Sequence, residues 1–417
     1  MSRVISIGSS SVFISDGNYS SKYPKNDDFL ESGIPFISAN NLRNGKVVWD
    51  NMKFISPQQH ESLKKGHLKT GDVLLVTRGS LGTTAYVTKD FEDANINAQL
   101  VLLRADGKTI DKRYLYYVVS TDEFFRGVLG HASGTAQPQL PIGALKQIPL
   151  RLHEFQVQKK IAAILSAYDD LIENNTRRSQ ILEEMARRIY EEWFVHFRFP
   201  GHDNIRRVKK QESVPENWSI NSIADFGNVV TGKTPSKRDS NNFGLDVPFL
   251  KLPDMHGRLF CIDTSEKLSN KGAASQSSKF IPANSLCVSC IGTAGIVNIN
   301  AVECQTNQQI NSLIPNNADD REYLYFALLR LKDLINQYGA NGATMVNLNK
   351  TKFESLPVIQ PTEKLVKNYH QVTYPLFQQI LNLQRKNDVL RSTRDLLLPK
   401  LISGEIDVSN FPEPETD

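Results

Sequence analysis

The chain has 417 residues, and its 49 Lys and Arg against 45 Asp and Glu leave a net charge of +4. This length suits two to four domains, and so weak a charge excludes a histone-like basic coat. With 40% hydrophobic and 23% charged residues, the chain is not intrinsically disordered. Because it has no apolar run of the ~18–20 residues that a membrane span needs, no secretory h-region and only four cysteines, we expect a cytoplasmic protein that does not contact membranes.

The sequence contains an internal repeat. Short segments of the first half recur in the same order in the second half, at an offset that drifts from 213 to 208 residues. Six ordered matches with a smoothly drifting offset indicate a duplication rather than chance. The matched segments are 34–37 with 247–250, 74–82 with 287–295, 97–99 with 307–309, 114–117 with 323–326, 134–135 with 342–343, and 148–149 with 356–357.

Each copy begins with a part rich in Gly, Asn, Ser and Thr. In the first copy, short apolar runs at 73–77 and 100–103 are bounded by such residues and predict strands, whereas 111–129 predicts one or two helices. We therefore expect an α+β fold with two pseudo-repeated mixed α/β domains, at 1–150 and 214–358. Residues 200–213 would be a linker and 407–417 a tail.

Each copy ends in a helical region, at 151–199 and 359–406. Apolar residues there recur in alternating steps of four and three, the spacing of a coiled-coil seam. The first seam comprises Ile161, Leu165, Tyr168, Ile172, Asn175, Ser179, Leu182, Ala186, Ile189 and Trp193. Adding 208 gives Tyr369, Thr373, Leu376, Ile380, Leu383, Asn387, Leu390, Arg394, Leu397 and Leu401.

We expect the two long helices to pair, because neither can bury its apolar stripe alone. Asn175 and Asn387 are polar seam residues that would set the register of the pair. Pro375 should kink or restart the second helix, and Pro399 should kink or end it. Ordinary amphipathic bundle helices, or pairing with partner helices, remain alternatives at this point.

The sequence offers no catalytic constellation. It lacks a phosphate-binding P-loop, a G-x-S-x-G elbow and an H-E-x-x-H helix, and its eight histidines are dispersed. Cys287 and Cys290 form a C-x-x-C, with Cys261 and Cys304 nearby, but they fall on strand positions that need no metal in the first copy. We read them as buried free thiols and expect no metal site.

Polar and basic residues gather in the loops of both copies. Lys and Arg neutralise phosphates, while Asn, Gln, Arg and Ser read base edges, so both copies are candidates for DNA binding. Taken singly, each such Lys is more commonly a solvated surface residue. The first copy offers Ser38, Asn40, Asn41, Arg43, Lys46, Arg78 and Ser80, and the second offers Lys233, Lys237, Arg238, Lys251, His256, Arg258, Asn347 and Lys350.

Nearly the whole chain resembles the specificity subunits of type I restriction–modification systems. The resemblance rests on 158–165 (QKKIAAIL), 168–173 (YDDLIE), 181–184 (ILEE) and 193–195 (WFV), on 398–406 (LPKLISGEI), and on Pro215-Glu216-Asn217-Trp218 at the start of the second α/β domain. The first copy lacks this Pro-x-x-Trp motif, so its first strand should be altered or shortened.

The resemblance implies a non-catalytic subunit. Each α/β domain would read one half of an asymmetric, bipartite sequence in double-stranded DNA, and the paired helices would set the gap between the halves. Two modification subunits, which use S-adenosylmethionine, would dock on the helices, and restriction subunits, which use ATP and Mg²⁺, could join. The alternatives are a specificity protein of a related type IIB-like system, an enzyme in its own right, and a coiled-coil scaffold that binds proteins.

Overall fold

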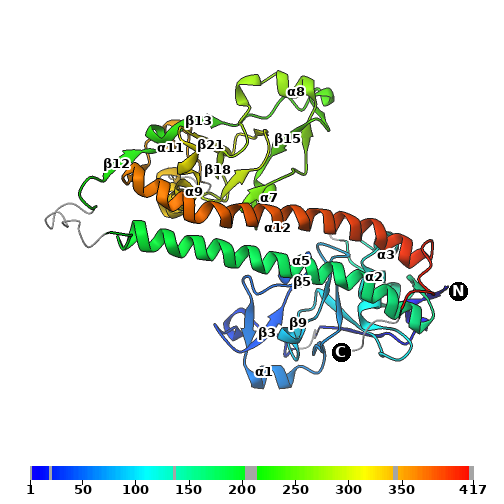
Figure 1. Cartoon of the computed structure of the whole chain (residues 1–417). Helices are drawn as coiled ribbons and strands as arrows, with labels where there is room; N and C mark the ends of the chain where they lie inside the picture. Colours follow the sequence, from blue (N-terminus) through cyan, green and yellow to red (C-terminus); the bar gives the residue numbers. More distant parts are fainter. Residues whose placement is uncertain (1, 18–20, 135–137, 202–213, 341–345, 413–417) are drawn as a thin grey trace. The chain divides into compact units, whose positions relative to one another are not determined.

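The computed structural model describes residues 2–17, 21–134, 138–201, 214–340 and 346–412. The chain divides into two compact units, one of residues 1–172 with 390–417 and the other of residues 173–389. Each unit combines one α/β domain with segments of two long helices, α5 (Phe155–Tyr190) and α12 (Glu363–Ser403), both of which are visible in Figure 1. The predicted fold class is confirmed. Most of the predicted linker (from 202) and the end of the tail (from 413) lie outside the described residues.

The α/β domain of the first unit is built on a six-stranded sheet with two smaller sheets beside it. Its central strand carries a continuous VLLV run because both of its faces are buried. In sheet order the large sheet is β2 (Phe13–Asp16), β10 (Leu100–Arg104), β7 (Val73–Val76), β8 (Thr84–Tyr86), β5 (Gly45–Val47) and β4 (Leu42–Arg43). The smaller sheets are β6 (Lys53–Ile55), β3 (Ile34–Ile37) and β9 (Asn95–Ile96), and β1 (Arg3–Ser6) with β11 (Pro149–Leu152).

Four short helices complete this domain, and side-chain caps start three of them. Ser56, Asp111 and Thr121 each accept a hydrogen bond from a backbone N–H of the first turn that would otherwise lack a partner. The helices are α1 (Pro57–Ser62), α2 (Lys112–Val119), α3 (Asp122–His131) and α4 (Ile142–Leu145).

The second unit repeats this architecture. Its largest sheet is β13 (Gly227–Thr231), β21 (Ile310–Pro315), β18 (Leu286–Ser289), β19 (Val297–Asn300) and β16 (Phe260–Cys261). Beside it lie β14 (Phe243–Gly244), β17 (Lys267–Leu268), β15 (Val247–Leu250) and β20 (Gln305–Thr306), and the pair β12 (Ser219–Ser222) with β22 (Pro357–Gln360). Its short helices are α6 (Ile223–Phe226), α7 (Leu252–Met255), α8 (Asn270–Ala274), α9 (Arg321–Arg330), α10 (Lys332–Gly339) and α11 (Lys350–Glu354).

The first strand of the first copy is not shortened, contrary to expectation. β1 pairs with β11 over four residues, and β12 pairs with β22 over four residues in the same antiparallel manner. Pairing with the closing strand therefore sets the strand length in both copies. The Pro-x-x-Trp motif has another role in the second copy, where Trp218 packs at 5.6 Å between ring centroids against Phe199, which follows the first long helix.

The residues of the two predicted helical seams lie on α5, on the short turn that follows it, and on α12. All twenty predicted seam positions are buried or half-buried, and none is exposed. In the second unit, Asn175 Nδ2 donates to Asn387 Oδ1 at 2.9 Å, and Asn387 Nδ2 donates to Thr176 Oγ1 at 3.1 Å. In the first unit, Arg394 on the seam donates to Asp169 at 2.5 Å. The polar seam residues are therefore matched to partners, and the helices run antiparallel within each unit.

Neither proline ends or restarts the second long helix, so the predicted restart at Pro375 and the predicted end at Pro399 are wrong. α12 is continuous over 41 residues through both Pro375 and Pro399. A proline in a helix interior costs about 3 kcal/mol. Next to Pro375, Phe377, Ile380 and Leu381 are buried, and burying each such side chain is worth roughly 1.5–3 kcal/mol, so tertiary packing outweighs the local cost. No helix in the described part of the chain has both the length and the apolar character to cross a bilayer.

Candidate nucleic-acid interface

Several loops of the first unit meet at one edge of its large sheet. Strand β10 is antiparallel to both β2 and β7, and β7 is antiparallel to β8. Consequently β2 and β7 end, and β8 and β10 begin, at the same edge. The second unit has the same arrangement, since β13 and β18 end where β19 and β21 begin. We call these places the first and second recognition edges.

The smaller sheet adds a further loop to each recognition edge. The backbone N–H of Asn97 donates to the carbonyl of Ile37 at 2.8 Å, and that of Asn307 donates to Leu250 at 3.1 Å. The loops that follow β3 and β15 therefore begin beside the turns that precede β10 and β21. This brings Ser38 to the first recognition edge and Lys251 to the second.

A tight glycine turn forms the centre of each recognition edge. Gly79 and Gly82 have φ of 85° and 79°, and Gly292 and Gly295 have φ of 81° and 84°. This left-handed region is costly for any residue with a Cβ atom, which explains the repeated G-x-x-G spacing without a phosphate site. The turns present exposed side chains: Arg78 and Ser80 in the first copy and Thr293 in the second.

A returning segment pairs with each glycine turn. Arg78 forms a backbone bridge with Gln139, and Ile291 forms the equivalent bridge with Asn347. Both Gln139 and Asn347 are exposed. Asn347 was among the candidates predicted from the sequence, whereas Gln139 was not. Its place beside Arg78 depends on a backbone pairing between residues that are far apart in the chain.

The turn before the next strand is stabilised in the same way in both copies. Asn97 Nδ2 donates to Gln99 Oε1 at 3.2 Å and Asn97 Oδ1 accepts from the Gln99 N–H at 3.0 Å; Asn307 and Gln309 repeat these bonds at 2.9 and 3.1 Å. These residues were recognised only as part of the repeat. The repeat itself was the signal, since it marked positions that the duplication had kept.

The fifteen DNA-binding candidates occupy different surroundings, and their contact with DNA stays a prediction. Ser38, Arg78, Ser80, Lys233, Lys251 and Asn347 lie at the two recognition edges. Lys237 and Arg238 are exposed in the loop that follows β13 and Gly232, and Asn40 is exposed just after β3. Arg43 and Lys46 flank a hairpin tip whose counterpart holds His256 and Arg258; Asn44 and Gly257 take positive φ at these tips, 52° and 71°. Because β5 is parallel to β8 and β16 to β19, both tips lie toward the recognition edges.

Some candidates are held by other protein groups. Asn41 is buried and fastens its own loop, accepting from Ser38 N–H at 3.0 Å and donating to Asp50 O at 3.0 Å. The remaining pairs are Arg43 with Asp50 (3.0 Å), Lys251 with Glu266 (2.9 Å), Arg258 with Asp388 of α12 (3.3 Å) and Lys350 with Glu354 (3.4 Å).

Tyrosine–carboxylate hydrogen bonds tie each domain to the first long helix. Tyr117 donates to Asp169 at 2.6 Å in the first unit, and Tyr325 donates to Glu183 at 2.7 Å in the second. Burial raises the pKa of Glu183, and burial with the Glu183 charge raises that of Tyr325, so both favour the protonated form. The sequence marked these tyrosines as helix residues without indicating partners 52 and 142 positions away.

The four cysteines are buried and free. Burial raises the pKa of both Cys261 and Cys287 to about 12, so they are neutral thiols rather than the thiolates that bind zinc. The prediction that the four cysteines are buried free thiols agrees with these surroundings.

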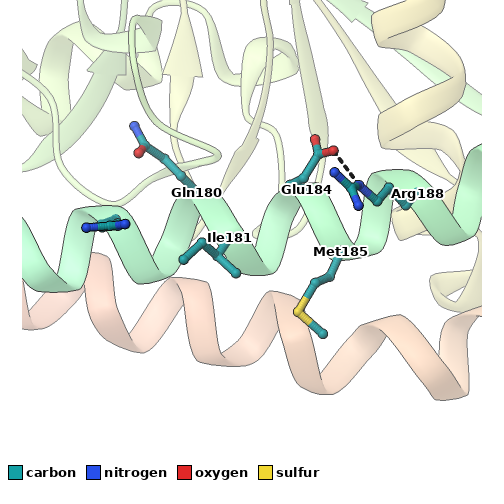
Figure 2. A pocket seen from close by; sticks show the side chains of 6 residues that line it. Gln180, Ile181, Glu184, Met185 and Arg188 are labelled. Atoms are coloured by element: carbon teal, nitrogen blue, oxygen red, sulfur yellow. Dashed lines mark hydrogen bonds and ion pairs between the residues drawn. The ribbon is translucent and has the colours of Figure 1, made fainter.

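A shallow groove lies on the outer face of α5 in the second unit (Figure 2). Ile181 and Met185 are 52% and 47% exposed there, and Glu184 is hydrogen-bonded to Arg188 at 2.8 Å. Exposed apolar side chains framed by charged ones are typical of protein contact surfaces. The remaining lining residues are Arg177 and Gln180.

Comparison with known proteins identifies relatives along nearly the whole chain. The family described as type I restriction modification DNA specificity domain matches twice, at residues 14–184 and 215–387. The HindI specificity subunit of Haemophilus influenzae, a type I restriction enzyme subunit, is 28% identical over 89% of this chain and 94% of its own length. The MjaIX specificity subunit of Methanocaldococcus jannaschii is 24% identical over 92% of this chain and 89% of its own.

A solved structure shares the fold. The S subunit of a type I restriction-modification system from M. genitalium matches with a TM-score of 0.56 at 15% identity, covering 96% of both chains.

Proposed function

Because the chain belongs to the family of type I restriction modification DNA specificity domains, we infer that it is a non-catalytic specificity subunit that reads an asymmetric, bipartite DNA sequence. The family match accounts for the duplication, since each copy supplies one DNA specificity domain. Methyltransferase and endonuclease activities belong to partner subunits. We propose that each recognition edge reads one half of the target.

This proposal rests mainly on one observation: the two recognition edges have the same backbone turns but expose different side chains. Both edges share the glycine turn and the Asn-x-Gln turn. The exposed groups differ, with Arg78 and Ser80 at the first edge and Lys233 and Asn347 at the second. Basic side chains bind phosphates and amides or hydroxyls read base edges, so a shared frame with different readers suits two unlike half-sites.

The helices would set the spacing between the half-sites. α5 has 36 residues and α12 has 41, lengths of about 54 and 62 Å at 1.5 Å per residue. A single polar pair in an apolar seam disfavours slipped registers, because slipping would leave both amides buried without partners. We propose that the Asn175–Asn387 bond fixes the register of the helical spacer, and with it the gap that the complex accepts.

We further propose two modification subunits as partners, docked on the helices, with restriction subunits as optional additions. The exposed Ile181 and Met185 make the α5 groove a candidate contact surface. In this scheme none of the cofactors of the catalysed reactions binds this chain: S-adenosylmethionine would bind the modification subunit, and ATP and Mg²⁺ a restriction subunit. The location would be the cytoplasm, where the DNA and these subunits are.

Mapping methylated adenines in DNA exposed to this chain together with its modification subunit tests the proposal directly. We expect one split, asymmetric motif. Exchanging residues 214–358 for the corresponding domain of a relative should change one half of the motif and leave the other half and the gap intact. A change in both halves would refute the modular reading, and no sequence-dependent methylation or protection at all would favour the protein scaffold.

Single substitutions at the recognition edges refine this test. Arg78→Ala and Lys233→Ala, measured in the complex, should weaken DNA binding, and loss of one phosphate contact should lower the salt slope of log K by about 1. Lys364→Ala is the matched control, since this exposed lysine lies in the first turn of α12 and belongs to none of the loops that form the recognition edges. Equal effects of all three would contradict the assignment of the edges.

A further inference from the structure

The first α/β domain contains a cluster of side chains that could bind a metal ion and that has no role in the proposed recognition of DNA. His60 of α1, His67 and Asp93 each offer one donor atom, and these atoms all lie within 4.8 Å of one another. His60 Nε2 is 3.4 Å from Asp93 Oδ2, and His67 Nδ1 is 3.9 Å from Asp93 Oδ1. Within the described residues, this is the one group of three or more His, Cys, Asp or Glu with donor atoms so close together.

Hydrogen bonds fix which nitrogen of each ring is available. His60 Nδ1 contacts Asn95 Oδ1 at 2.5 Å, and His67 Nε2 contacts the carbonyl oxygen of Leu63. Because the Leu63 carbonyl can only accept, His67 Nε2 carries the hydrogen, and with Asn95 Oδ1 as its partner His60 Nδ1 does too. In a neutral ring, the second nitrogen then carries no hydrogen and has a free lone pair. These second nitrogens, His60 Nε2 and His67 Nδ1, are the ones that face Asp93. A ligating histidine characteristically donates its second N–H to a carbonyl or amide oxygen in this way.

A cation between the three facing groups would be attracted by all of them. Two imidazole lone pairs and a carboxylate repel one another when no proton or metal ion is shared. Asp93 also has a φ of 64°, an uncommon left-handed conformation for a residue with a side chain.

The second copy shows that the fold does not need the two histidines. The repeat places Ala273 opposite His60, since Ser56 and Ser269 cap the equivalent helices. The same offset of 213 places Phe280 opposite His67. Ala273 and Phe280 belong to an apolar cluster with Phe249. The polar cluster is therefore specific to the first copy and is not a packing requirement.

We propose that the first α/β domain binds one divalent transition-metal ion, Zn²⁺, through His60 Nε2, His67 Nδ1 and the Asp93 carboxylate. Zn–N and Zn–O bonds of ~2.0–2.1 Å place tetrahedral donors ~3.3 Å apart, close to the 3.4 Å found between His60 and Asp93. Two imidazoles favour zinc over Mg²⁺ or Ca²⁺, which select oxygen ligands. Asp93 is 70% exposed, so water can take the fourth position.

Such an ion would brace the first recognition edge. It would join α1 to the segment that enters β9, where Asn95 pairs with β3. The next residues include Asn97, which shapes the turn at the edge. Metal binding would therefore act on the part of this domain that presents Ser38 and its neighbours.

The test uses the purified full chain, treated with a chelator and then titrated with Zn²⁺ by calorimetry and with Co²⁺ by visible absorption. We expect one equivalent per chain, intense tetrahedral Co²⁺ bands and a higher melting temperature with metal. Asp93→Asn keeps the size and tolerates the left-handed conformation, and it should weaken binding at least ~100-fold, beyond the 10–100-fold usual for outer-shell partners. The double variant His60→Ala with His67→Phe, which copies the second domain, should bind none.

His196→Ala is the matched control, because this exposed histidine lies outside the cluster, and it should bind as the unaltered chain does. Far-ultraviolet circular dichroism of the metal-free proteins checks that each variant is folded. The proposal is overturned if the folded wild-type chain binds neither Zn²⁺ nor Co²⁺ at micromolar concentration. It is equally overturned if Asp93→Asn binds as tightly as the wild type, since the cluster would then be only an ion-paired surface group.

Discussion

The bond between Asn175 and Asn387 allows the register of the helical spacer to be tested quantitatively. The two residues are 9% and 3% exposed, and the bond length is 2.9 Å. Asn175→Leu would remove the donor to Asn387 Oδ1, and Asn387→Leu would remove the acceptor of Asn175 Nδ2; burying either atom without this bond costs about 1–3 kcal/mol of unfolding free energy. The double Leu variant restores an apolar seam, and we expect it to be close to the wild type in stability.

Urea unfolding followed by tryptophan fluorescence measures these differences. Trp193 and Trp218 both lie in the second unit, with Asn175 and Asn387, whereas Trp49 lies in the first unit and can be replaced by Phe in all variants. The double-mutant cycle should give a coupling energy of about 0.5–3 kcal/mol. The complex of the double variant with its modification subunit should in addition methylate DNA with altered gaps, because an apolar seam specifies register less strictly.

Two results would refute this reasoning. If the single variants cost less than ~0.5 kcal/mol each, the amides are not effectively buried. If the double variant loses the sum of the two single losses, then the residues act independently and the pair does not specify register.

Three further outcomes follow from the second unit. Pro375→Ala should stabilise the chain by about 1–3 kcal/mol, measured by urea unfolding, because it removes an interior proline. Burial, and then neighbouring carboxylates, raises the pKa of Asp320 to about 6. Between about pH 4 and 6 the folded state therefore binds this proton more tightly than the unfolded state does. The free energy of unfolding consequently falls as the pH rises through that window. Asp320→Asn should reduce the difference in melting temperature between pH 4 and pH 7. Gly295→Ala should lower the melting temperature more than Gly292→Ala, because both have positive φ but only the former meets Lys332 Cα, at 3.0 Å.

Much of the fold could be predicted from local sequence patterns. The apolar spacing of the seams requires no knowledge of distant residues, and all twenty positions are buried or half-buried as expected. The duplication likewise predicted paired glycine turns, because only Gly readily adopts the positive φ that both copies require. Local rules failed at Pro375 and Pro399, where packing against the domain outweighs a helix-breaking residue.

The sequence by itself determined the repeated α/β-plus-helix plan, the helical register and the family, because each of these is written in spacing along the chain. The tertiary structure alone decided which loops share an edge, since the strand order β2-β10-β7-β8-β5-β4 does not follow the chain. It also decided that Gln139 lies beside Arg78 and that His60, His67 and Asp93 converge. Strand pairing and burial bring these residues together from positions that are dozens of residues apart. The local sequence around each of them gives no indication of its neighbour.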